Sequence, residues 1–166
     1  MEREEFLSVY RHSLAHILAK AVIELYGKEV QYAIGPQIDD GCYYDFVLPK
    51  AVTQDDFKTI EDKMREIIKR REDWTRKEVS KSEALSMFKD QKFKTELIND
   101  LPEDETITVY YTGEDYVDLC RGPHVSNSQE LMNVSYQVRT DMNSSKESLK
   151  LILIPCYIFF KILLGI

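Results

Sequence analysis

Two short clusters contain all three histidines of this 166-residue chain, and they lie far apart in the sequence. The first cluster carries His12 and His16, and the second carries Cys120 and His124. Side chains four residues apart on a helix share one face, so the two imidazoles of the first cluster point the same way. A turn that carries a cysteine and a histidine can close over that face. The fold is therefore expected to join the clusters around either a tetrahedral metal site or a polar catalytic pocket.

The composition is that of one ordinary globular domain with a hydrophobic core. The formal net charge of −7 argues against a generic nucleic-acid-binding protein, which would be basic overall. A local basic stretch from Lys63 to Lys77 remains, although such a run is usually a solvated helix face. Three cysteines make no disulfide framework, and the N-terminus lacks the apolar core of a signal peptide, so a cytoplasmic, reducing location is expected.

Hydrophobic periodicity and capping signals predict an α+β domain, with helices packed on a mostly antiparallel sheet. An amphipathic helix is predicted over 5–26, ended by Gly27, and a second helix begins after Thr53 and runs through Arg71. Ser80 and Glu83 form a capping box that opens a short helix, expected over 83–89. A further helical segment is expected over 93–98, and strands are expected over 31–34, 42–46, 74–79, 106–111 and 116–119, with a turn at 39–41.

The last part of the chain changes character, and we divide the sequence into 1–139 and an unmatched apolar tail, 140–166. Residues 149–166 are almost wholly apolar but are interrupted by Lys150 and Lys161. A membrane span usually needs about 20 apolar residues, and a lysine near its centre costs a few kcal/mol. No membrane association is therefore expected. A β-rich or helical continuation of the core and a chain end outside the evolved fold remain the alternatives to an anchor.

Four motifs carry a family resemblance: HSLAH at 12–16, AIGP at 33–36, DGCYYDF at 40–46 and YVDLCRGPH at 116–124. Together they resemble the second additional domain of bacterial threonyl-tRNA synthetases, which alanyl-tRNA synthetases share more distantly. The resemblance runs from about residue 6 to residue 139. It implies an α+β editing module that hydrolyses mischarged seryl-tRNA(Thr), with the serine-carrying acceptor end of tRNA(Thr) as its partner.

The resemblance also implies roles for the polar residues of the two clusters. His12 is the first candidate to position or activate the attacking water, with His16 beside it. Asp118 is suited to hold the substrate ammonium or to tune His124, although an ordinary strand-end carboxylate is the alternative. Cys120 and His124 complete the wall of the pocket, and their compact shape is expected to reject the methyl group of threonine.

Three residues outside these clusters, or at their edge, receive roles in the same way. Lys94 is the candidate to stabilise the anionic intermediate or to assist the base, against the alternative of a solvated helix lysine. Tyr44 is a candidate contact for the substrate side chain or the terminal adenosine, although an aromatic residue on a strand is more often part of the core. Arg121 is a candidate phosphate or ribose contact, with a structural ion pair as the alternative.

The identity of the donors leaves the metal question open. His12, His16, Cys120 and His124 have the right chemistry for zinc, which the alanyl-type relatives imply at this place. The threonyl-type relatives imply a metal-free reaction mediated by water. We therefore expect that no cofactor is required and keep zinc as the alternative.

The chain departs from the family pattern in two respects. It lacks the small ubiquitin-like domain found at the N-terminus of many such synthetases, and from Thr140 onward it matches neither the family's linker nor its aminoacylation core. We therefore expect a truncated or frameshifted synthetase without ligase activity, whose parent is a homodimer through the missing domains. Besides an editing hydrolase, a non-catalytic remnant that binds the tRNA acceptor end and a structural zinc module remain possible functions.

Overall fold

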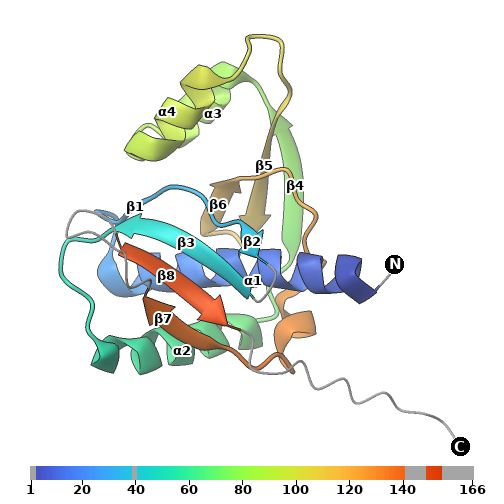
Figure 1. The fold of residues 1–166 in the computed structure, drawn as a ribbon. Coiled ribbons are helices and arrows are strands. Elements are labelled where there is room, and N and C mark those ends of the chain that lie inside the picture. The colour runs from blue at the N-terminus through green and yellow to red at the C-terminus, as the bar shows by residue number, and fades with distance from the viewer. Residues whose placement is uncertain (1–2, 39–40, 141–148, 155–166) are drawn as a thin grey trace, which may run out of the picture.

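The computed structural model describes residues 3–38, 41–140 and 149–154 (Figure 1). The chain alternates helices and strands in mixed order. The elements are α1 (Arg3–Tyr26), β1 (Gln31–Tyr32), β2 (Gln37–Ile38), β3 (Gly41–Val47), α2 (Gln54–Lys69), β4 (Trp74–Val79), α3 (Lys81–Met87), α4 (Lys92–Asp100), β5 (Ile107–Thr112), β6 (Tyr116–Leu119), the 3-10 helix η1 (Ser128–Leu131), β7 (Gln137–Thr140) and β8 (Leu149–Ile154).

The strands form two antiparallel sheets, which confirms the predicted α+β class. The larger sheet has the order β1-β3-β8-β7, with β2 also paired to β3. The smaller sheet has the order β4-β5-β6. Figure 1 shows α1 and α2 beside the larger sheet, whereas α3 and α4 lie together at one end of the smaller sheet. The two sheets thus belong to two parts of the fold that meet at α1.

The first helix differs from its prediction in one respect. The sequence suggested an amphipathic helix with one buried stripe, but every residue from Ser13 to Val22 is buried. A helix that is covered on all sides is part of the core rather than its lid. Even Lys20 is only 1% exposed, because its ammonium group donates hydrogen bonds to Glu72 and to the carbonyl oxygen of Thr112. The surroundings of α1 therefore include polar partners from the β4–β5 region.

The local capping signals correctly predicted the N-caps of two helices, although α3 covers 81–87 instead of the expected 83–89. Thr53 caps α2 in a capping box with Asp56, and Ser80 caps α3 in a capping box with Glu83. The second helix ends at Lys69, two residues before its predicted end, and Arg71 has a positive φ of 59°. Its inward face is as expected, with Ile60, Met64, Ile67 and Ile68 buried and Phe57 partly buried.

The apolar tail enters the fold in part. Residues 149–154 form β8, which lies between β3 and β7, with Leu151 opposite Tyr44 and Thr140. Of the alternatives left open by the sequence, residues 149–154 match the β-rich continuation of the core. Residues 155–166 and the turn predicted at residues 39 and 40 lie outside the described residues. Within the described part of the chain, no helix has the length and the apolar character needed to cross a membrane.

Candidate functional site

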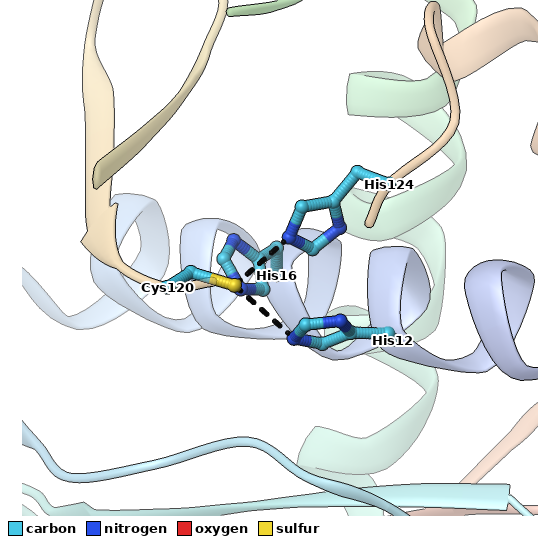
Figure 2. Close-up of side chains that lie close together, drawn as sticks. All are labelled: His12, His16, Cys120 and His124. Atoms are coloured by element: carbon cyan, nitrogen blue, oxygen red, sulfur yellow. Dashed lines mark hydrogen bonds between the residues drawn. The ribbon is translucent and has the colours of Figure 1, made fainter. Parts of the chain in front are cut away.

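The structure brings the two histidine-containing clusters together. His12 and His16 project from α1, Cys120 follows the end of β6, and His124 lies on the loop beyond it (Figure 2). One donor atom from each of the four residues can be chosen so that all lie within 4.8 Å of one another. The imidazole of His124 packs against both other rings, with centroid distances of 4.3 Å to His12 and 4.2 Å to His16. The predicted convergence is therefore present.

The loop from Cys120 to His124 is held against β5. The backbone N–H of Cys120 donates to Thr108, and the Thr108 hydroxyl donates to the Cys120 carbonyl over 2.6 Å. Gly122 has a φ of 73°, and a Cβ atom at this position would lie 2.3 Å from the Tyr110 hydroxyl. Only glycine fits there, because the backbone is left-handed and the Tyr110 ring leaves no space. A cis peptide bond follows, between Gly122 and Pro123.

The thiol of Cys120 lies at the centre of the cluster. Its Sγ atom is 3.3 Å from Nε2 of His12 and 3.2 Å from Nε2 of His124, and the Gly122 N–H points at the sulfur from 3.2 Å. Burial raises the pKa of this thiol to about 12, and the hydrogen bond from Gly122 offsets only part of that effect. The cysteine is therefore a neutral thiol at physiological pH in the metal-free protein, rather than an activated nucleophile.

Burial keeps the three imidazoles neutral. Desolvation lowers the pKa of His12, His16 and His124 below its usual range, and His16 is affected strongly because its side chain is almost fully buried. The nearby charge of Asp118 and a hydrogen bond to the backbone of Pro123 partly counteract this effect at His12. Neutral imidazoles carry a lone pair on one ring nitrogen, which is the form that accepts a proton or binds a metal.

A buried polar network stands behind the cluster. Asp118 is 1% exposed, and its Oδ1 atom lies 2.5 Å from the ammonium group of Lys94, which is also 1% exposed. The other carboxylate oxygen accepts hydrogen bonds from the hydroxyls of Tyr44 and Tyr116, over 2.5 and 3.0 Å. It also lies 3.6 Å from Nε2 of His16. The network therefore connects α4, β3, β6 and α1 at one carboxylate.

The structure shows where three of the residues singled out from the sequence lie. Lys94 is a buried partner of Asp118 and not a solvated helix lysine. Tyr44 has no exposed surface, so in this structure it is a core residue that supports Asp118. Arg121 is 80% exposed at its side chain and forms an ion pair with Glu105. The structure thus brings His12, His16, Cys120 and His124 into contact, and Arg121 lies apart from them at the surface.

Two polar residues of the site received no role from the sequence. Ser13 is fully buried and contacts His124, and Tyr116 donates to Asp118. The position of Ser13 between His12 and His16 on a largely apolar helix is a sequence signal for a polar contact at the site. Tyr116 has a signal of another kind, because it lies two residues before Asp118 on the same strand and therefore shares its face.

The four donors fit a zinc ion by their chemistry. Cysteine and histidine are the usual ligands of tetrahedral zinc sites. In addition, Nδ1 of His16 is buried without a hydrogen-bond partner among the residues that the structure describes. A buried nitrogen of this kind calls for a partner, which a cation or a donor group on a ligand can provide.

A pocket of about 220 Å³ opens beside Cys120. Its wall is mostly apolar, with Glu105 and Arg121 as its charged members. The remaining lining residues come from α4, β5, the segment that joins them, the β1–β2 segment and the end of β6: Leu97, Leu101, Thr106, Ile107, Thr108, Ile34 and Leu119. An apolar pocket next to a cluster of polar side chains is the usual form of a small-molecule site.

The basic stretch of the sequence is largely neutralised by neighbouring acids. Arg70 forms two hydrogen bonds of 2.7 Å with Glu24 and a third with Glu66. Lys63 also pairs with Glu66, and Arg65 pairs with residues 61 and 62 of the same helix. Lys63, Arg65 and Arg70 therefore lie on or next to the solvated helix face that the pattern suggested, whereas Arg76 and Lys77 lie on β4 and not on a helix.

Comparison with known proteins identifies the domain. Residues 107–150 match the family model described as the threonyl and alanyl tRNA synthetase second additional domain. This match assigns residues 107–150 of the chain to that domain family. The chain is 48% identical over 130 residues to the threonine--tRNA ligase of Thermotoga neapolitana, and 45% identical over 128 residues to that of Staphylococcus epidermidis. The threonine--tRNA ligase of Borrelia hermsii is 44% identical over 127 residues.

These three alignments cover 77, 77 and 76% of the chain but only 20, 20 and 21% of the relatives. The chain thus spans about one fifth of the length of the curated relatives that it matches. The match to the family model also reaches residue 150, beyond the boundary expected at residue 139.

Proposed function

We propose that this domain hydrolyses the ester bond of misacylated tRNA, with seryl-tRNA(Thr) as its substrate. The observation that carries the proposal is the meeting of His12 with Cys120 and His124 beside the buried Asp118–Lys94 pair. Ester hydrolysis requires an oriented water, groups that stabilise the developing oxyanion, and a means of holding the substrate ammonium. Polar groups of the right kinds for these tasks lie in and behind the site.

His12 is better placed than His16 to act on the water. His12 is partly exposed, whereas His16 is only 2% exposed and its Nε2 atom faces Asp118. In the proposed reaction, neutral His12 accepts a proton as the water oxygen bonds to the ester carbonyl carbon. When the tetrahedral intermediate collapses, the ester C–O bond breaks and the ribose oxygen takes up that proton. The products are free serine and uncharged tRNA.

The buried network supports this reaction from behind. The positive charge of Lys94 balances the negative charge of Asp118. The negative charge that develops on the substrate therefore does not meet an unbalanced negative charge behind the site. In the proposed reaction, Cys120 and His124 form the wall next to the reacting group, and this wall is expected to exclude the extra methyl group of threonine. One methylene group is worth about 1–3 kcal/mol of discrimination in a synthetic site, which explains why a second site is needed.

Serine release from seryl-tRNA(Thr) tests the proposal. The chain is expected to release serine faster than buffer alone and to leave threonyl-tRNA(Thr) intact, and His12→Ala should abolish most of the release. Cys42→Ala is a matched control, because Cys42 is a buried cysteine on β3 that is not among the four site donors. Serine release that His12→Ala leaves unchanged would refute the mechanism. Binding of the acceptor end without release would favour a non-catalytic remnant instead.

A structural zinc site is the second candidate function, favoured by the grouping of four His and Cys donors within 4.8 Å. If zinc is bound, His12, His16, Cys120 and His124 would hold it, and it would supply Lewis-acid chemistry or structural support. Metal analysis before and after treatment with a chelator tests this alternative. A stoichiometric zinc ion whose removal unfolds the chain would support it, and a folded, metal-free protein with full hydrolytic activity would exclude it.

A further inference from the structure

Ser13 makes three hydrogen bonds, one of which reaches His124 in the second cluster. It lies in the middle of α1 and has no exposed surface. Its Oγ atom is 2.8 Å from the carbonyl oxygen of Val9, 3.1 Å from the backbone nitrogen of Val125 and 3.1 Å from Nδ1 of His124. A single hydroxyl therefore contacts its own helix, the loop that follows the second cluster, and an imidazole of the site.

The capacity of a hydroxyl group decides the direction of each bond. A serine hydroxyl has one proton to donate and two lone pairs that accept. The Val9 carbonyl can only accept, so the hydroxyl proton points there. The N–H of Val125 can only donate, so it occupies one lone pair. The remaining lone pair can accept one more hydrogen bond, and His124 supplies it only when its Nδ1 atom carries the proton.

We propose that Ser13 is a positioning residue that holds His124 in the Nδ1–H tautomer. A neutral imidazole has one N–H, so Nε2 of His124 then presents a lone pair to Cys120 Sγ, 3.2 Å away. The opposite tautomer would direct an N–H at the sulfur and leave Nδ1 as a second acceptor facing a hydroxyl that has no proton left. Ser13 thus makes His124 an acceptor for a thiol, water or substrate proton. Only the kinetic consequence of this inference rests on the proposed function.

Nitrogen NMR of the ring measures the tautomer directly. In the chelator-treated chain labelled with ¹⁵N-histidine, slightly above neutral pH, the His124 signals are expected to show a protonated Nδ1 and an unprotonated Nε2. His124→Gln assigns these signals. Ser13→Ala is expected to shift the population toward Nε2–H, whereas Ser13→Thr should retain the Nδ1–H form, because threonine can keep the same bonds in a helix. A wild-type His124 that is mainly in the Nε2–H form would overturn the proposal, whether or not any variant folds.

A second buried serine provides the control. Ser128 is also fully buried, and its hydroxyl accepts from the Glu72 N–H and donates to the Ile68 carbonyl, as Ser13 does with its two backbone partners. Ser128→Ala should therefore destabilise the fold to a similar degree and leave the His124 tautomer unchanged. A Ser13→Ala protein that folds with an unchanged tautomer would refute the assignment.

The kinetic test separates this inference from the proposed function. For serine release, Ser13→Ala is expected to lower kcat by about 10- to 100-fold with little change in KM, which is the usual effect of removing a group that orients a site histidine. Ser13→Thr should restore most of kcat. If the tautomer is as expected but neither the wild-type chain nor any variant releases serine, the proposed function fails and the positioning role stands. If serine is released but Ser13→Ala changes neither kcat nor the tautomer, the positioning role fails alone.

Discussion

The ammonium group of Lys94 lies 2.5 Å from the carboxylate of Asp118, and neither side chain is more than 2% exposed. Lys94 comes from α4 and Asp118 from β6, so the pair joins two elements of the part of the fold that is built on the smaller sheet. The same ammonium group donates to the Tyr44 hydroxyl on β3 of the larger sheet. The pair therefore ties both parts of the fold together directly behind the histidines.

Breaking this pair from one side is expected to destabilise the protein strongly. Lys94→Met leaves the Asp118 carboxylate buried without its counter-charge, and removing one partner of a buried ion pair costs about 3–5 kcal/mol. The free energy of unfolding in urea measures the loss. Lys92→Met is the control, because Lys92 lies on the same helix but forms an exposed pair with Glu96, and such pairs contribute less than about 1 kcal/mol. Equal losses for the two variants would contradict the assigned role.

The parts of the fold that sequence reasoning predicted depend on local chemistry. The capping residues Thr53 and Ser80 act within one turn of their own helices, so their effect is readable without knowing the fold. The spacing of His12 and His16 is equally local. Their meeting with Cys120 and His124 was predicted because a turn that carries a cysteine and a histidine can close over one helix face. Such features depend on residues that are near in sequence or on chemistry that has few solutions.

The burial of Lys94 and the position of β8 were harder to predict because they depend on tertiary packing. Lys94 lies on a helix with an ordinary charged pattern, and only the approach of Asp118 and Tyr44 makes its burial favourable. Residues 149–154 read as an apolar run, and nothing in that run specifies that it inserts between β3 and β7. The complete burial of α1 has the same origin, since it depends on what packs around the helix.

Gly122 is expected to tolerate no side chain. Gly122→Ala would place a Cβ atom 2.3 Å from the Tyr110 hydroxyl at a φ of 73°, so the loop that carries Cys120 and His124 must move. Gly27→Ala separates strain from collision, because Gly27 has a φ of 88° but no atom within 4 Å of the added Cβ. We expect a loss of about 1–2 kcal/mol at Gly27 and a clearly larger loss at Gly122, together with the loss of serine release. Thermal unfolding and the deacylation assay test this, and equal losses of stability would argue against the collision.

The metal-free protein should lose stability as the pH falls below about 6.5, which is the ordinary pKa of histidine in an unfolded chain. In the folded state, burial lowers the pKa of His12, His16 and His124, so below this pH the unfolded state binds more protons. Stability that is fully present above about pH 6.5 therefore decreases by up to about 1.4 kcal/mol per pH unit for each histidine. His16→Gln should reduce this slope by one proton in urea titrations between about pH 5 and 6.5. An unchanged slope would show that His16 titrates normally.

Carboxylates such as Glu66, whose pKa is lowered to about 2 by hydrogen bonds from Lys63 and Arg70, contribute to the pH dependence of stability only at lower pH.

Arg121 and Arg70 should affect tRNA binding differently, although both are arginines of one domain. Arg121 is 80% exposed at its side chain and pairs with Glu105 at the rim of the pocket, whereas Arg70 is held by Glu24 and Glu66. We expect weak tRNA binding overall, since the net charge is −7 and little counterion is released. Arg121→Ala should weaken it further and reduce the slope of log K against log salt by about 1, as the loss of one phosphate contact does. Arg70→Ala should leave both quantities unchanged and lower the free energy of unfolding instead. Fluorescence anisotropy with labelled tRNA across a salt series measures both effects, and nanomolar binding at physiological salt, or equal effects of the two variants, would contradict this picture of the tRNA-facing surface.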